Sequence, residues 1–217
     1  MSTDQPRLVL LISGRGSNME TFIKATATGA LPGQIARVIS NRPEAPGLRT
    51  AQAAGIDTAV IDHRAYESRE AFDADLADAV SSEAPALVIL AGFMRILSPV
   101  FVRPFEGKLL NIHPSLLPLY PGLNTHQRAI DNGDVQAGAT VHYVTAQLDG
   151  GPAILQAAVP ILPDDTASAL AARTLTVEHQ IYPEAAAWHL SGRLHYREGR
   201  AWLDDKLLPA SGVRWQP

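Results

Sequence analysis

The most informative absence from this chain of 217 residues is cysteine, of which it has none. The lack of cysteine excludes disulfides, thiolate metal sites and a cysteine nucleophile, and it fits a reducing compartment. Basic residues are also in the minority. Lysine and arginine number 18 against 22 aspartate and glutamate residues, so the formal charge is −4 and a nucleic-acid partner is disfavoured.

Long apolar runs are missing as well. No stretch approaches the roughly 20 apolar residues that a membrane-spanning helix requires, and the first seven residues lack the basic region of a secretory signal. We therefore expect a cytoplasmic protein with no membrane partner. Because 46% of the residues are hydrophobic and no repeat or linker is evident, residues 1–217 are predicted to form a single domain.

Apolar runs alternate with helical patterns through the first half of the chain. Residues 8–12 and 86–91 are continuously apolar, as in strands that are covered on both faces. With further strands near 35–39 and 58–61, the order predicts a Rossmann-like α/β fold, with a mostly parallel twisted sheet and helices on both faces.

The C-terminal part is expected to add antiparallel strands. Around residues 140–143, apolar and polar residues alternate, which predicts a strand with two unlike faces. A long helix is predicted over residues 166–187, and Pro183 is expected to kink or perturb it.

A glycine-containing segment, Ser-Gly-Arg-Gly-Ser-Asn at residues 13–18, lies between the first strand and the first helix. Glycines at a helix N-terminus allow free N–H groups to cradle a phosphate, here with help from Ser17 or Asn18. The segment matches neither the P-loop nor the full dinucleotide pattern. The alternative is a tight turn in which Ser17 or Asn18 caps the helix.

Asn111 and His113 stand two apart at the end of an apolar strand, and they therefore point to the same side. Asp149 lies in a glycine-flanked loop from which it could approach His113. An amide, an imidazole and a carboxylate suit the oxyanion of an acyl transfer. The alternative is a structural histidine and an ordinary turn aspartate.

Other kinds of site are weakly supported. No His-x-x-x-His spacing occurs, so no metal site is expected. Ser17 and Ser115 lack the setting of a hydrolase nucleophile. Residues 92–97 could wall a pocket for a flat aromatic ligand, although the residues alone favour a plain packing loop.

Six motifs together resemble the folate-dependent phosphoribosylglycinamide formyltransferase family. The resemblance covers nearly the whole chain, from about residue 8 to about residue 203. The motifs are residues 11–14, 16–18, 91–95, 111–118, 120–122 and 148–152.

The resemblance implies formyl transfer from 10-formyltetrahydrofolate, the co-substrate, to the amine of glycinamide ribonucleotide in purine biosynthesis, without a metal. It implies a nucleotide-binding half over about residues 8–110 and a catalytic and folate-binding half over about residues 111–203. Asn111 and His113 would stabilise the oxyanion. Asp149 would hold His113 charged and assist proton transfer through water.

The resemblance also assigns binding residues. Those expected to bind the phosphate and ribonucleotide are Gly16, Ser17, Asn18, Pro114 and Glu178. Those expected to bind the folate are Arg69, Met94, Arg95, Ile96, Leu97, Asn111, Val144 and Asp149.

Two residues depart from the family pattern. Arg15 stands where relatives carry a small or amide residue, and it either contacts the phosphate or points to solvent. Leu175 stands where some relatives have a polar residue near the phosphate.

Three other functions remain as alternatives. Two are formyl-folate enzymes, the formyltetrahydrofolate deformylase and the transferase acting on methionyl-tRNA. They are disfavoured because the chain leaves no room for their additional domains and is net acidic. The third is a non-catalytic module that binds a nucleotide or a folate. A monomer and a homodimer are both compatible with the sequence.

Overall fold

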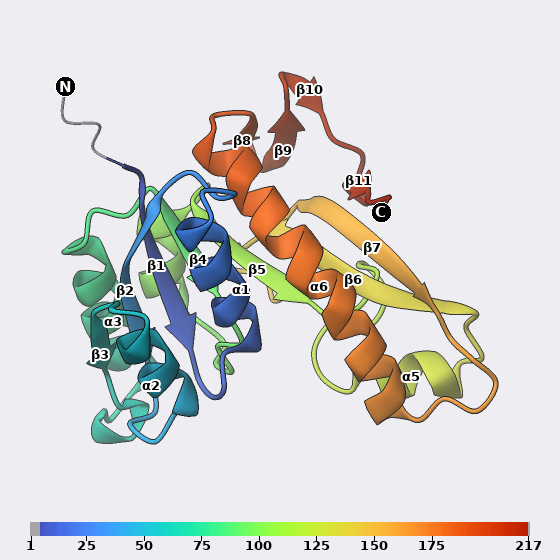
Figure 1. Cartoon of the computed structure of the whole chain (residues 1–217), viewed down its shortest axis with the longest axis horizontal. Coiled ribbons are helices and arrows are strands. Elements are labelled where there is room, and N and C mark those ends of the chain that lie inside the picture. The colour runs from blue at the N-terminus through green and yellow to red at the C-terminus, as the bar shows by residue number, and fades with distance from the viewer. Residues whose placement is uncertain (1–4, 217) are drawn as a thin grey trace.

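The computed structural model describes residues 5–216 of the protein, which form one mixed eight-stranded sheet and a separate three-stranded antiparallel sheet (Figure 1). The strands of the large sheet lie in the order β11-β7-β6-β5-β4-β1-β2-β3, and those of the small sheet in the order β10-β9-β8. The strands are β1 (Arg7–Ile12), β2 (Gln34–Ser40), β3 (Thr58–Val60), β4 (Leu87–Leu90), β5 (Leu109–His113), β6 (Gln136–Tyr143), β7 (Ala153–Pro160), β8 (Leu194–Arg197), β9 (Arg200–Leu203), β10 (Lys206–Leu207) and β11 (Val213–Arg214). The helices are α1 (Ser17–Ala27), α2 (Pro46–Ala53), η1 (His63–Ala65), α3 (Arg69–Ser81), α4 (Pro99–Val102), η2 (Arg103–Phe105), α5 (Thr125–Asp131) and α6 (Ala167–Leu190).

One strand of the large sheet, β6, runs opposite to the others. Strands β1 to β5 are parallel to one another, whereas β6 runs antiparallel to both β5 and β7. The last strand, β11, pairs parallel with β7. This arrangement confirms the predicted mostly parallel sheet with antiparallel strands in its C-terminal part.

Both faces of the sheet are covered by helices, and β1 shows how the sequence produces this. Leu8, Leu10 and Ile12 pack in one cluster with apolar residues of α1, α2 and α6. Val9 and Leu11 pack on the opposite face with residues of α3 and α4. All five side chains are fully buried, and burial of each aliphatic side chain stabilises the fold by about 1.5–3 kcal/mol.

Strand β6 has two unlike faces, as its sequence predicts, and both are covered, because its residues from 137 to 143 are all buried. One face packs under α6, and residues 115–117 cover the polar face. The Thr140 hydroxyl donates to the carbonyl of Ser115 and accepts from the N–H of Leu117. Hydrogen bonds thus satisfy the buried polar face of this strand.

Helix α6 crosses the sheet in front of β5, β6 and β7 (Figure 1). The Thr166 hydroxyl caps its first turn by accepting from the N–H of Ala169. Pro183 lies inside the helix, but the helix continues to Leu190. The predicted perturbation at Pro183 therefore does not interrupt the helix.

No helix within residues 5–216 combines the length and apolar character of a membrane span.

Candidate active site

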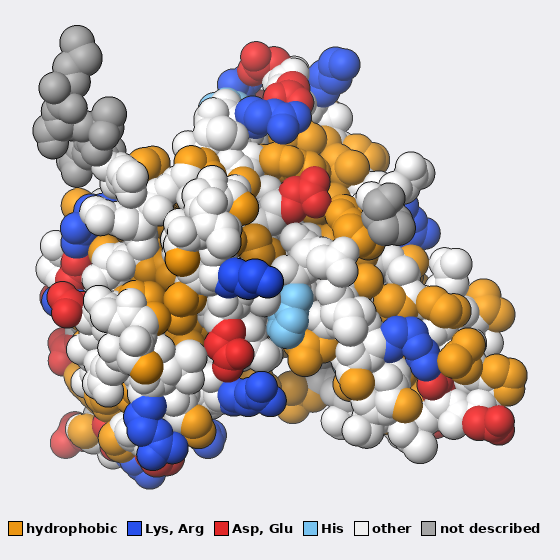
Figure 2. Space-filling view, viewed as in Figure 1, with side chains coloured by type: hydrophobic (Ala, Val, Ile, Leu, Met, Phe, Trp, Pro, Cys, Tyr) orange, Lys and Arg blue, Asp and Glu red, His pale blue; other side chains and the backbone are white. Residues whose placement is uncertain are grey.

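The carboxyl ends of β1, β4 and β5 meet at one edge of the sheet, which is where open α/β sheets bind ligands. Leu11 of β1 pairs with Leu90 of β4, and Leu90 pairs with Asn111 of β5. Strand β5 continues to His113, two residues beyond that level. The outline of the molecule is notched along this lower edge (Figure 2). The predicted site segments after these three strands are therefore neighbours.

The glycine loop, residues 13–18, joins β1 to α1. Gly16 is the residue before the helix, and its φ of 74° lies in the left-handed region that favours glycine. A Cβ at this position would meet the Met19 side chain at 3.2 Å. Helix α1 then begins at Ser17, and the N–H groups of its first turn have no partners within the helix. These free N–H groups could bind an anion, so phosphate binding at this turn stays a prediction.

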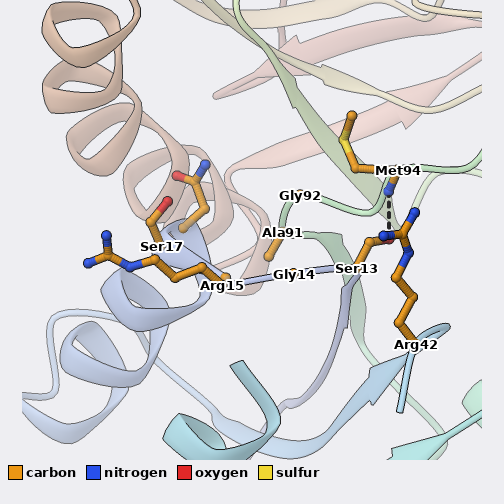
Figure 3. Close-up of a pocket in the computed structure, with 10 residues that line it drawn as sticks. Ser13, Gly14, Arg15, Ser17, Arg42, Ala91, Gly92 and Met94 are labelled. Atoms are coloured by element: carbon orange, nitrogen blue, oxygen red, sulfur yellow. Dashed lines mark hydrogen bonds between the residues drawn. The ribbon is translucent and has the colours of Figure 1, made fainter. Parts of the chain in front are cut away.

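A cavity of about 340 Å³ opens beside the glycine loop. It is large enough for a phosphorylated sugar, and basic side chains and backbone line it. Figure 3 shows Ser17 on one side and Arg42 beside Ser13 and Met94 on the other. The lining residues are Ser13, Gly14, Arg15, Gly16, Ser17, Asn18, Arg42, Ala91, Gly92 and Met94.

Arg15 extends away from Met94 and Arg42 in Figure 3. Its side chain is 81% exposed, and its Nε lies 3.8 Å from a carboxylate oxygen of Glu20. Of the two alternatives, this conformation agrees with a side chain that points to solvent.

Asn18 and Glu178 meet at the base of the glycine loop. The Asn18 amide donates to the Glu178 carboxylate over 2.9 Å, and both side chains are buried. Burial raises the pKa of Glu178, while the hydrogen bond from Asn18 opposes the shift. The oxygen of the Asn18 amide and the hydroxyl of Thr174 are buried without hydrogen-bond partners. A polar ligand in this corner would meet unsatisfied hydrogen-bonding groups.

Asn111, His113 and Asp149 come together as predicted. His113 Nδ1 lies 3.4 Å from Oδ2 of Asp149, and both side chains are less than one-tenth exposed. The same carboxylate oxygen accepts the N–H of Gly122 over 2.8 Å. On the other side of the ring, Nε2 lies 2.8 Å from the carbonyl of Tyr120. A carbonyl only accepts, so Nε2 carries a proton, and a second proton on Nδ1 would face the carboxylate.

His142 completes this group from the neighbouring strand, where it pairs with Asn111. Its Nδ1 lies 2.9 Å from the carbonyl of Tyr143 and therefore carries the proton. Nε2 is then an acceptor, and it receives the Asn111 amide N–H over 3.2 Å. Burial lowers the pKa of His142 from 6.5 to about 4, so this histidine is neutral. The interaction fixes which end of the Asn111 amide faces His142.

The residues predicted for the folate lie on a loop and on α3, next to the cavity. Met94 and Ile96 are exposed, and Leu97 packs into the core. The Arg95 guanidinium lies 5.0 Å from the centre of the Phe72 ring on α3. Arg69, at the start of α3, is exposed and lies 3.5 Å from the Glu70 carboxylate.

Residues 6–186 match the formyl transferase family. This protein belongs to the formyl transferase family. It is 50% identical over 205 residues to the phosphoribosylglycinamide formyltransferase of Escherichia coli, which covers 94% of this chain and 97% of that protein. The corresponding enzyme of Haemophilus influenzae is 47% identical, with 95% and 97% covered. A solved structure of the Coxiella burnetii phosphoribosylglycinamide formyltransferase superimposes with a TM-score of 0.92 at 44% identity, covering 97% of this chain and 99% of that one.

In this formyl transferase, sequence reasoning missed three contributors to the site. His142 is not among the predicted site residues, because its pairing opposite Asn111 indicates a contact only when the strand register is known. Ser13 and Arg42 also line the cavity. Arg42 follows β2, and only the position of β2 beside β1 brings it near the glycine loop.

Two expectations for this formyl transferase need correction or restriction. Neither Ser17 nor Asn18 caps α1, because Gly16 occupies the cap position and no side chain caps the helix. Pro114 is not among the residues that line the large cavity. It lines a small hollow with Leu119 and Tyr120.

Val144, which was predicted to bind the folate, is half-buried, and its N–H donates to the carbonyl of Leu109.

Within residues 5–216 of this formyl transferase, no group of three or more histidine and acidic side chains is arranged to hold a metal ion.

Proposed function

We propose that this protein transfers the formyl group of 10-formyltetrahydrofolate to the amine of glycinamide ribonucleotide. The observation that carries the proposal is the arrangement at the carboxyl ends of β1 and β5. The glycine loop lies at the same edge of the sheet as a half-buried amide, a buried imidazole and a buried carboxylate. The relatives named above support the choice of substrates.

The acceptor would occupy the cavity beside the glycine loop. Its phosphate would bind the N–H groups at the start of α1, together with the Ser17 hydroxyl. Glu178 and Asn18 would bind the ribose or glycyl part, where buried polar atoms of Asn18 and Thr174 have no partner. The partial positive charge at the N-terminus of α1 and the positive charge of Arg42 both attract anions, so the cavity suits a dianionic phosphate group.

The donor would lie between two segments. One is the donor loop, defined as residues 92–97, and the other is the loop at residues 144–149. The exposed apolar side chains of Met94 and Ile96 would cover the flat pterin. Arg95 and Arg69, on the same side, would meet the carboxylates of the folate tail. No metal takes part in the proposed reaction.

The chemistry follows from the central group. The acceptor amine attacks the formyl carbon, and the carbonyl oxygen becomes an oxyanion. The free N–H of Asn111 and a proton of His113 stabilise that charge. Asp149 receives the proton that the amine loses, through a water molecule. Collapse of the intermediate breaks the bond to the folate nitrogen, and this nitrogen takes up the proton that Asp149 received, which regenerates the carboxylate. The products are the formylated ribonucleotide and tetrahydrofolate.

A formyl-transfer assay tests this proposal. Purified protein, 10-formyltetrahydrofolate and glycinamide ribonucleotide, without metal, formate or ATP, should yield tetrahydrofolate and formylated ribonucleotide in equal amounts. The control omits the ribonucleotide. Equal consumption of the donor without the acceptor would instead identify a deformylase, and binding of both ligands without turnover would identify a binding module.

A further inference from the structure

Ser13 lies where the glycine loop meets the donor loop. Its hydroxyl accepts the N–H of Met94 over 2.8 Å and donates to the amide oxygen of Asn41 over 2.6 Å. Its own N–H donates to the carbonyl of Gly92 over 3.2 Å. Figure 3 shows the bond from Met94 at the edge of the cavity. One residue of the glycine loop therefore holds the donor loop at two points.

The donor loop depends on this attachment for its position. Gly92 has a φ of 77°, a left-handed turn directly after β4, and the N–H of Met94 then reaches back to the end of β1. The side chains of Met94 and Ile96 are 67% and 57% exposed. Phe93 and Leu97 pack into the core, whereas these two exposed side chains contribute little packing, so backbone hydrogen bonds determine where the segment between Phe93 and Leu97 lies.

Asn41 orients the Ser13 hydroxyl. Its side-chain oxygen accepts a hydrogen bond from the Ser13 hydroxyl. A lone pair of the Ser13 Oγ is therefore free to accept the N–H of Met94. Ser13 is 6% exposed and Asn41 1% exposed, so water does not compete for these bonds. Removal of the hydroxyl would leave a buried donor and a buried acceptor without partners.

We propose that Ser13 is a positioning residue that sets the spacing between the acceptor and the donor. It contributes to the affinity for both substrates although it need not contact either. This inference rests on the proposed function, because it assigns the acceptor to the glycine loop and the folate to the donor loop. The alternative is a bond that only stabilises the ends of β1 and β4.

Asp73 provides a matched comparison at the other end of the donor loop. This fully buried side chain of α3 accepts the N–H of Ser98, the residue after the donor loop, over 2.5 Å. Asp73 is not among the residues that line the cavity. Loss of its carboxylate should loosen the donor loop alone.

The experiment measures steady-state kinetics with each substrate varied in turn. In Ser13→Ala, the KM values for glycinamide ribonucleotide and for 10-formyltetrahydrofolate should both rise about tenfold, as expected for one hydrogen bond to a buried group. In Asp73→Ala, only the folate KM should rise. Ser13→Thr keeps the hydroxyl and should return both KM values toward those of the wild type.

Two results would overturn the inference. If Ser13→Ala lowers the melting temperature but leaves both KM values unchanged, the residue is only structural. If only one of the two KM values changes, Ser13 does not set the spacing. Should Ser13→Ala fail to fold, Asn41→Ala frees the hydroxyl to rotate. Both KM values should then rise by a smaller factor, and unchanged values would overturn the inference. Failure of the proposed function is distinguishable, because the wild-type protein would then not formylate the ribonucleotide.

Discussion

Two histidines within a few ångströms of Asp149 have different environments. His142 is 2% exposed and donates to a backbone carbonyl, and burial lowers its pKa to about 4. His113 lies against the carboxylate of Asp149. The neutral His142 orients the Asn111 amide, and we assign His113 to the oxyanion. The hydrogen-bond partners of each ring thus give two side chains of identical chemistry different roles.

The depressed pKa of His142 predicts an acid-sensitive fold. In the unfolded chain this group takes up a proton near pH 6.5, but in the folded protein it does so only near pH 4. Its contribution to stability is therefore complete above pH 6.5 and is lost as the pH falls toward 4. Between pH 7.5 and pH 5 the loss should be about 2 kcal/mol.

Urea unfolding at the two pH values measures this loss. In His142→Gln, which has no titrating group at this position, the difference in unfolding free energy between pH 7.5 and pH 5 should be smaller by about 2 kcal/mol. An identical pH dependence in the wild type and the variant would contradict the burial of a neutral imidazole.

Asp149→Asn tests the proposed proton acceptor. The asparagine oxygen still accepts the N–H of Gly122, so the loop should keep its place. The variant cannot accept the amine proton, and kcat should fall on the order of 100-fold or more, with much smaller changes in KM. A large loss of substrate affinity with normal kcat would exclude this role. Urea unfolding of the variant controls for a loss of stability.

At the scale of elements, the turn between β6 and β7 carries Asp149 to the end of β5. Gly151 makes the close approach that this turn requires, because a Cβ there would lie 1.8 Å from the carbonyl oxygen of Tyr143. No rotamer relieves such a contact with backbone, so any larger residue must displace the turn. The position of Asp149 thus depends on a glycine that contacts no predicted substrate.

Gly151→Ala should therefore impair activity more than stability. We expect kcat to fall at least about tenfold, because catalytic groups act only when held close to their productive geometry. Gly133→Ala is the control, since it has a φ of 71° but open space around its Cβ position. It should lower stability by about 1–2 kcal/mol without changing kcat. Equal activities of the two variants would contradict the importance of the turn.

The elements that could be predicted from the sequence are those in which local pattern and burial agree. The apolar run of β1 and the left-handed Gly16 before α1 follow from residues within a few positions of one another. The burial of the polar face of β6 could not be predicted in this way. In the sequence, Thr140 and His142 alternate with apolar residues, which predicts a polar face but not what covers it. That face is buried because residues 115–117, which are distant in sequence, pack over it. Arg42 was missed for the same reason.

At the scale of the whole molecule, one sheet runs through both predicted halves. The predicted boundary between the halves falls inside β5, which pairs with β4 of the nucleotide half, and α6 of the catalytic half packs against α1 of the other. The charges of the surface are mixed rather than segregated, since basic and acidic side chains interleave on the face shown in Figure 2. The two halves contribute to one core cluster, and the single domain stays a prediction.

A shared core predicts one cooperative unfolding transition. All three tryptophans, at positions 188, 202 and 215, lie in the C-terminal part of the chain, so intrinsic fluorescence reports mainly on the surroundings of that part. Far-UV circular dichroism reports on both halves. The two signals should give the same urea midpoint and slope. Two separated midpoints would show that the halves unfold independently, and would contradict the single domain.

The hydrogen bond between Asn18 and Glu178 joins residues 160 positions apart. During synthesis, the glycine loop therefore leaves the ribosome long before its partner on α6 has been translated. The first strands can pair early, but the contact between Asn18 and Glu178 cannot form until α6 has emerged. The glycine loop therefore acquires this buried partner only after residue 178 has been translated and has left the ribosome.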